Sequence, residues 1–101
     1  MLDYIISEVK PKSGIMRPVH EDVLNCECYI IDIQKGERAI IKVRLGDSVH
    51  YETHTFRTSP VVDFYFSKDS KIFTIETANT IYTLGALKPA AFPFSEELIQ
   101  E

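Results

Sequence analysis

Apolar and polar residues alternate strictly in the middle of this chain, and that alternation restricts the fold more than any other feature of the sequence. Between residues 39 and 45, every second side chain is apolar: Ala39, Ile41, Val43 and Leu45. The positions between them hold Ile40, Lys42 and Arg44. Because successive side chains of a β-strand point to opposite faces, the pattern predicts a strand with one face in a core and the other in water.

Similar short patterns, separated by turn residues, predict further strands along the chain. The expected segments are residues 24–34, 49–57, 61–66, 72–77 and 81–84. The first is apolar on both faces and favours a central strand, whereas residues 49–57 are polar and favour an edge. We expect Ser59-Pro60 to end the strand 49–57, because proline cannot donate a hydrogen bond to a strand ladder. Gly36 fits the turn before residue 39, where glycine accepts a positive φ.

The two ends of the chain are less regular. Residues 2–9 fit a strand, and a short helix fits their pattern almost as well. Pro18 suits the first turn of a helix, which predicts one helical turn within residues 18–24. Near the other end, Ser95 is expected to cap a short helix that runs through Gln100.

These segments together predict the fold class. About six or seven short strands in a row are typical of a mostly β protein, and residues 1–101 are long enough for a single β domain. An antiparallel meander of this size curls into a compact barrel, SH3-like or similar. We favour this barrel, with residues 88–101 as an irregular and helical C-terminal segment. A flat sheet covered by the two terminal segments is the alternative.

Composition and charge restrict the class of protein, its partners and its expected location. With 45% hydrophobic and 26% charged residues, the chain has the composition of an ordinary globular protein. The net charge of −4 argues against a polyanionic partner for the surface as a whole, although a local basic stripe can still bind one. No apolar run approaches the roughly 20 residues of a membrane span. Residues 1–6 include an acid and no base, so we expect no secretory signal, no membrane association and a cytoplasmic location.

The two cysteines, Cys26 and Cys28, are the next candidates for chemistry. On a strand they would lie about 6.5–7 Å apart, at the far edge of disulfide reach, so we expect free thiols in a reducing compartment. Two thiolates on one face can join a zinc site with His20 or with one of the later histidines, His50 and His54. The usual Cys-x2-Cys spacing is absent, however, and the apolar neighbours Leu24 and Ile30 favour buried, inert thiols.

The segment His50-Tyr51-Glu52-Thr53-His54 offers ligands for zinc or iron. On a strand, His50, Glu52 and His54 point to the same face. The two histidines would lie about 13 Å apart on a straight strand, which is too far to share one ion without a bulge. We therefore prefer a solvated edge strand and expect no metal, with these three residues as the candidate ligands.

Basic residues gather on one expected hairpin: Lys35, Arg38, Lys42 and Arg44. Small barrels bind single-stranded nucleic acid with such grooves, using aromatic side chains for stacking. The nearby Phe64, Phe66, Phe73 and Tyr82 fit a core as well as a stacking surface. A solvated charged face is the competing interpretation.

The C-terminal segment carries Phe92 and Phe94 around a proline. Two large apolar side chains in an irregular segment are expected to be buried somewhere. They can plug the open end of their own barrel, or they can dock on a second copy of the chain. The sequence leaves both arrangements open.

No catalytic motif stands out, since the four glycines are isolated in turns and no Gly-x-Ser-x-Gly surrounds Ser59. The sequence favours a non-enzymatic binding or assembly module without a cofactor, which contacts a protein partner or a second copy through a sheet edge or the aromatic tail. The alternative is a nucleic-acid-binding barrel that uses the basic hairpin. A metal-dependent enzyme using His50, Glu52 and His54 comes third.

Removal of the C-terminal segment tests the expectation for Phe92 and Phe94. Burial of each ring stabilises a fold by about 1.5–3 kcal/mol. Truncation after Gly85 should therefore lower the melting temperature by several degrees, as measured by circular dichroism. If the contact is between chains, the truncated protein should also elute as a smaller species on sizing. An unchanged melting temperature together with an unchanged size would show that the segment is not docked.

Overall fold

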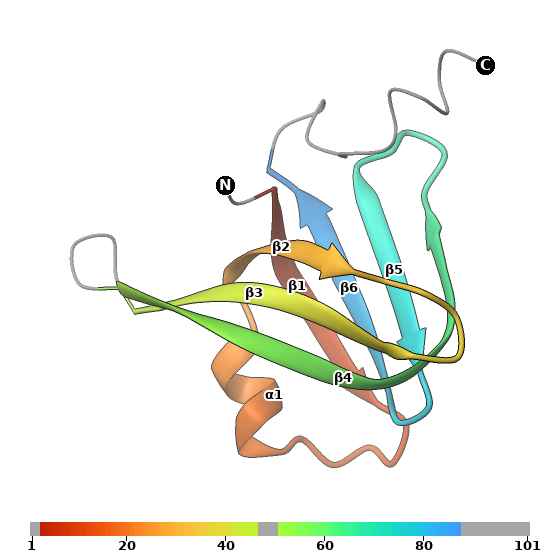
Figure 1. The fold of residues 1–101 in the computed structure, drawn as a ribbon, viewed down its shortest axis with the longest axis horizontal. Coiled ribbons are helices and arrows are strands. Elements are labelled where there is room, and N and C mark those ends of the chain that lie inside the picture. The colour runs from red at the N-terminus through yellow and green to blue at the C-terminus, as the bar shows by residue number, and fades with distance from the viewer. Residues whose placement is uncertain (1–2, 47–50, 88–101) are drawn as a thin grey trace.

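The computed structural model describes residues 3–46 and 51–87, which form six strands and one short helix (Figure 1). The strands are β1 (Tyr4–Pro11), β2 (Glu27–Asp32), β3 (Arg38–Gly46), β4 (Tyr51–Phe66), β5 (Ile72–Thr77) and β6 (Thr80–Ala86). The helix α1 (Pro18–Val23) follows β1. The candidate residue His50 and the aromatic pair Phe92 and Phe94 lie outside the described residues, as does the expected helix after Ser95.

All six strands pair antiparallel in chain order, and β6 pairs with β1, so the sheet closes into a barrel. The β1–β6 pairing runs along the whole of β1, whereas β1 meets β2 only at Tyr4 and Ile5. The predicted mostly β meander that closes into a small barrel is confirmed, and the flat sheet is wrong. Residues 4–11 form a strand rather than a short helix.

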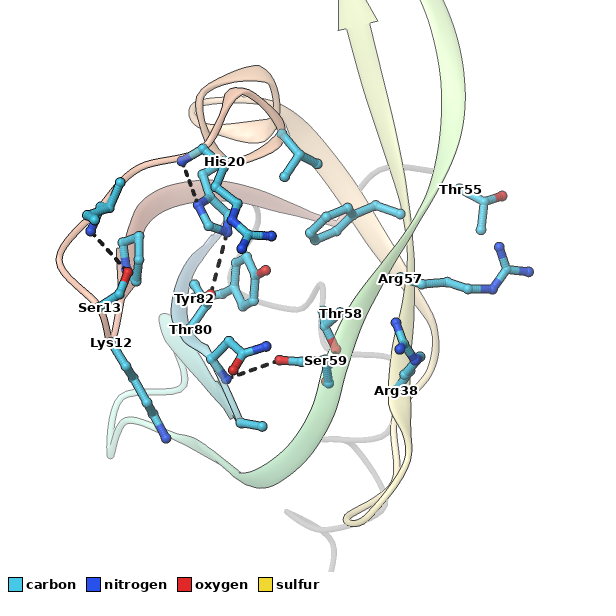
Figure 2. Close-up of a pocket in the computed structure, with 17 residues that line it drawn as sticks. Lys12, Ser13, His20, Arg38, Thr55, Arg57, Thr58, Ser59, Thr80 and Tyr82 are labelled. Atoms are coloured by element: carbon cyan, nitrogen blue, oxygen red, sulfur yellow. Dashed lines mark hydrogen bonds between the residues drawn. The ribbon is translucent and has the colours of Figure 1, made fainter.

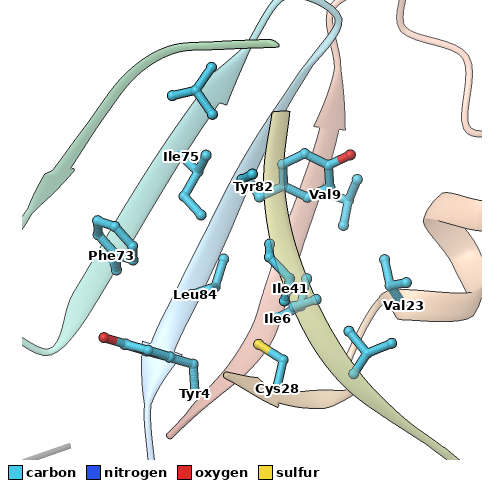
Figure 3. Close-up of a cluster of buried hydrophobic side chains, with 13 residues drawn as sticks. Tyr4, Ile6, Val9, Val23, Cys28, Ile41, Phe73, Ile75, Tyr82 and Leu84 are labelled. Carbon is cyan, nitrogen blue, oxygen red and sulfur yellow. The ribbon is translucent and has the colours of Figure 1, made fainter. Parts of the chain in front are cut away.

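The core lies inside this closed sheet, where strands contribute alternate side chains (Figure 3). On β3 the predicted apolar face is confirmed: Ala39, Ile41 and Val43 are buried, although Leu45 near the strand end is only partly covered. Gly36, in the turn before β3, has a φ of 88°, the positive value that the turn was expected to need.

Aromatic side chains fill one end of the core around Phe73, which has no exposed surface. The Phe73 ring stacks on Phe66 with a centroid distance of 4.3 Å and meets Phe64 edge-on at 5.9 Å. Tyr4 lies against it at 6.0 Å. Tyr82 is also buried and meets Phe56 edge-on. Phe73 and Tyr82 are therefore core residues, and the partly buried Phe64 and Phe66 pack against that core.

The strand β4 is longer than the sequence predicts, because Ser59-Pro60 does not interrupt it. Proline restricts the preceding residue to extended geometry, which allows a strand to continue through it. Here Pro60 lies where β4 exchanges partners. Residues 51–60 pair with β3, whereas residues 61–66 pair with β5, and the register shifts on both sides of the exchange. The missing N–H of Pro60 thus falls at a corner of the barrel rather than inside a regular ladder.

Residues 51–57 are an edge on one side only. They pair with β3, and none of the described strands pairs with their other side. This segment is therefore an edge, as expected. The second half of the same strand, residues 61–66, pairs with β5 in the closed wall of the barrel. In Figure 1 the β3–β4 pair extends beyond the other strands on one side of the barrel.

The segment before β2 departs from the expected central strand at 24–34. Asn25 has a φ of 66°, so the chain turns there and β2 begins only at Glu27. Cys28 is fully buried, as predicted, but Cys26 is partly exposed and lies outside the strand. The expectation that both thiols are buried on one strand face is wrong for Cys26, because the left-handed residue before it rotates the chain out of the strand.

Helix α1 begins at Pro18, which occupies the first turn as predicted. Its Val23 side chain is buried against the core, and His20 is the other buried side chain of the helix. Within residues 3–46 and 51–87, no helix has the length and the apolar character that a membrane crossing requires.

The position at which β6 ends shows where a truncation of the C-terminal segment should begin. Ala86 is still part of β6, and the Leu87 N–H donates to the Asp3 carbonyl at 3.0 Å. A cut after Gly85 removes these contacts together with the C-terminal segment. A cut after Leu87 therefore isolates the contribution of residues 88–101.

Substitution of Phe73 tests whether the aromatic cluster stabilises the barrel. Phe73→Ala removes a buried ring that contacts three other aromatic side chains, and we expect it to lower the free energy of unfolding by about 3–5 kcal/mol. Tyr65→Ala is the matched control, because Tyr65 is 56% exposed on the neighbouring strand and should change stability by about 0.5 kcal/mol or less. Equal effects in urea denaturation would contradict the assigned core.

Candidate functional site

A cleft of about 500 Å³ opens at the end of the barrel where β1 stops and β6 begins (Figure 2). One wall is the connection from Pro11 to Arg17 together with the start of α1. The opposite wall is the middle of β4, and the floor is the turn between β5 and β6. The lining includes Lys12, Ser13, Arg17, His20, Arg38, Thr55, Phe56, Arg57, Ser59, Asn79, Thr80 and Tyr82.

Hydroxyl groups fix the floor of the cleft. The Ser59 hydroxyl donates to Thr77 Oγ1 at 2.7 Å, and Thr77 donates in turn to the Thr80 carbonyl at 2.8 Å. The backbone N–H of Asn79 donates to Ser59 Oγ at 3.2 Å. Because Thr77 is completely buried, this chain of bonds holds the β5–β6 turn against β4 and gives the floor one defined shape.

His20 links the wall formed by α1 to the floor of the cleft. Its side chain is 8% exposed, and Nδ1 accepts the backbone N–H of Arg17 at 3.1 Å, which closes the first turn of α1. A backbone N–H can only donate, so the hydrogen of the neutral ring lies on Nε2. That atom is 3.5 Å from Thr80 Oγ1 on the floor. The imidazole thus positions the helix over the barrel end.

Among the described residues that line the cleft, every charged side chain is basic: Lys12, Arg17, Arg38 and Arg57. Lys12 is bound to Glu76, with Nζ 2.8 Å from Oε2, and it points away from His20 in Figure 2. Among the described residues, no carboxylate lies within ion-pair distance of the three arginines. The rim of the cleft therefore carries positive charge that acidic side chains do not neutralise.

The basic residues predicted on the β2–β3 hairpin have different surroundings. Lys35 Nζ lies 3.2 Å from Asp63, and this hydrogen bond holds the pKa of that carboxyl below its usual value. Arg44 lies 2.9 Å from Glu27. Lys42 faces outward, with Nζ 3.5 Å from Thr55 Oγ1, and Arg38 is on the rim of the cleft. The four residues therefore do not form one continuous stripe of unneutralised charge.

Arg57 lines the cleft but is not among the candidate residues that the sequence indicates. In the register of β3 and β4, Ile40 lies opposite Arg57 and Lys42 lies opposite Thr55. Arg57 and Thr55 therefore share the outward face of Lys42, and Figure 2 shows both pointing away from His20. The alternation of residues 53, 55 and 57 was available in the sequence, but the pairing register that places them beside Lys42 was not.

The proposed metal ligands are only partly described. Glu52 and His54 share one face, with His54 Nε2 3.0 Å from Glu52 Oε2, and both side chains are exposed. Among residues 3–46 and 51–87, no group of three or more His, Cys, Asp and Glu side chains is arranged to hold a metal. Since His50 lies outside these ranges, the three candidate ligands are not tested together, and the absence of a metal stays a prediction.

The two thiols are free. Burial raises the pKa of Cys28 to about 12, so its thiol stays protonated at neutral pH. Burial also raises the pKa of Cys26, whose Sγ–H donates to the Asp22 carbonyl at 3.1 Å. Burial therefore favours the protonated thiols over the thiolate form that acts as a nucleophile.

Comparison with known proteins gives no family for this chain. No protein-family model matches the sequence, and no curated protein or solved structure matches it either. Its function therefore has to be inferred from the cleft and from the surfaces around it.

Thiol labelling tests the two cysteine environments. At about pH 8, an aromatic disulfide reagent should modify Cys26 well before Cys28, because only Cys26 is partly exposed and its pKa is raised less. Cys26→Ser should remove the fast phase, whereas Cys28→Ser should leave it unchanged. Rapid modification of Cys28 in the folded protein would contradict its burial.

Proposed function

We propose that this barrel is a non-enzymatic binding module that holds an anionic ligand in the cleft. The observation that carries the proposal is the charge of the described lining, which includes three arginines without an acidic partner, together with Lys12 bound to Glu76, and no acidic side chain. The whole chain has a net charge of −4, so this local excess runs against the overall composition. A concentration of one sign of charge in a cleft raises the local concentration of an oppositely charged ligand.

The dimensions and chemistry of the cleft support this proposal. A volume of about 500 Å³ falls within the roughly 300–1,000 Å³ of ligand pockets. Guanidinium groups bind carboxylates and phosphates through paired hydrogen bonds, and Arg17, Arg38 and Arg57 supply them at the rim. The exposed apolar side chains of Ile15 and Val19 line the same wall as Arg17, across the cleft from β4. The ligand that fits best has anionic groups beside an apolar surface.

A binding role is supported over catalysis by what the polar side chains of the cleft contact. The His20 nitrogens face the Arg17 backbone and Thr80, and the Ser59 hydroxyl is bound to Thr77. A nucleophile needs a base within hydrogen-bond reach, and these contacts form no such pair. The groups are arranged to hold the walls in place.

A second candidate is assembly with a protein strand. Among the described strands, residues 51–57 pair only with β3. Their other side can therefore pair with a strand from a partner protein. Such pairing rests on backbone hydrogen bonds and changes little with salt, whereas anion binding weakens as salt rises. Sizing at low and high salt therefore distinguishes the two candidates.

We also propose a reducing compartment, such as the cytoplasm. Cys26 and Cys28 are both free, although one is partly exposed to solvent. Disulfides form and persist mainly in oxidising compartments, so two free thiols in so small a chain support a reducing one. The intact mass of protein isolated without reductant tests this expectation.

Thermal denaturation with tripolyphosphate tests the anion site. Tripolyphosphate should raise the melting temperature relative to sodium chloride at equal ionic strength, by about 4–8 °C for each kcal/mol of binding. The double variant Arg38→Ser/Arg57→Ser should lose this rise. The control Lys68→Ser/Lys71→Ser removes the same charge away from the cleft and should keep it. No rise in the wild type, or equal losses in both variants, would contradict the proposal.

A further inference from the structure

The cleft continues onto the outer surface of the barrel through residues that belong to both. Thr55 lines the cleft, and its hydroxyl is also 3.5 Å from Lys42 Nζ on the outward face of β3. Arg57 lines the cleft and lies opposite Ile40 on the same outward face. A ligand held at the rim by Arg57 can therefore extend along β3 and β4 without crossing the barrel wall.

This outward face combines cations with an aromatic ring. The registers place Tyr29 of β2 opposite Lys42 and Lys42 opposite Thr55, so the three side chains form one row across the sheet. The adjacent row along the strands contains Arg57, and Arg38 lies at the end of β3 beyond it. Tyr29 is partly exposed. We call Tyr29, Lys42, Arg57 and Arg38 the outer basic face.

We propose that the outer basic face binds a single strand of nucleic acid, which enters the cleft at the rim. This inference rests on the proposed anion site and names its ligand. Lys42, Arg57 and Arg38 would contact successive phosphates, and the Tyr29 ring would stack on a base. Cations that follow the backbone, beside an aromatic ring that receives a base, are the combination by which proteins bind single strands.

Acidic residues define the borders of this face. Glu27 neutralises Arg44 at one end, with 2.9 Å between their charged atoms. Asp32, which lies opposite Ile40, is exposed along the β2 side. Both carboxylates lie on β2, on the opposite side of β3 from Arg57. They would repel a polyanion from the β2 side, so a phosphate backbone is expected to follow β3 and β4.

The Tyr29 ring favours nucleic acid over an acidic peptide. A row of carboxylates needs only the cations, and nothing in such a ligand requires an aromatic ring beside Lys42. Every nucleobase has a flat face that stacks on such a ring. The exposed Ile15 and Val19 on the far wall of the cleft offer an apolar surface to a base that enters it.

Fluorescence anisotropy with labelled oligo-dT and oligo-U of about twelve nucleotides tests this inference, since single-strand sites span about 4–16 nucleotides. Three phosphate contacts predict a slope of about −2 for log affinity against log salt, from about −0.7 per contact. Lys42→Ala and Arg57→Ala should each reduce the steepness by about 0.7. Lys71→Ala, outside this face, should leave the slope unchanged.

The contribution of the ring is tested separately. Tyr29→Ala should weaken binding by about tenfold with an unchanged salt slope, because stacking is not electrostatic. Tyr29→Phe keeps the ring and should keep the affinity, so it controls for changes in folding. Equal affinity of Tyr29→Ala and Tyr29→Phe would overturn the stacking role and with it the inference.

The remaining outcomes separate this inference from the anion site. Stabilisation by tripolyphosphate without binding of either oligonucleotide would overturn the inference and leave the anion site standing. Tighter binding of poly-glutamate than of oligonucleotide would identify an acidic peptide instead, and tighter binding of a duplex would exclude the single-strand path. Absence of binding to tripolyphosphate and to all of these polymers would overturn both proposals.

Discussion

Closure of the sheet between β1 and β6 is the interaction on which the rest of the structure depends. The pairing runs along the whole of β1 and brings the two ends of the meander together. It encloses a single apolar interior, in which the ring of Phe73 contacts Tyr4, Phe64 and Phe66. A chain of 101 residues gains most from such an arrangement, because a closed barrel has few exposed strand edges and one shared core.

The cleft is a direct consequence of how the barrel closes. At Pro60, β4 leaves β3 and joins β5. Its first half extends past the closed wall, and none of the described strands pairs with the other side of that half. The opening beside it is covered by the connection after β1 and by α1, which His20 fixes to Thr80. Arg38 of β3 lies opposite Pro60, and Arg57 comes three residues before it on β4. The bend of β4 that shapes the cleft therefore also brings these two arginines to its rim.

The sequence predicted the elements that depend on local periodicity and missed those that depend on register. The alternation from Ala39 to Leu45 identified the buried face of β3, and the series of turns identified the barrel. Arg57 was missed because only strand pairing places it beside Lys42. Pro60 was misread as a break, since no local signal distinguishes a strand end from a corner. The prediction that Cys26 lies on a strand is wrong, because the alternation of apolar and polar residues does not reveal the left-handed conformation of Asn25.

The central claim is that the cleft, and not the surface in general, holds the anion. Two-dimensional NMR of the backbone amides during a tripolyphosphate titration tests it most directly. We predict that the resonances of Arg38, Arg57 and Thr80 shift and saturate together, because these residues line the cleft. Lys68 and Tyr65, which do not line the cleft, should not respond. Shifts scattered over all basic surface residues without saturation, or centred on Lys68, would contradict the account.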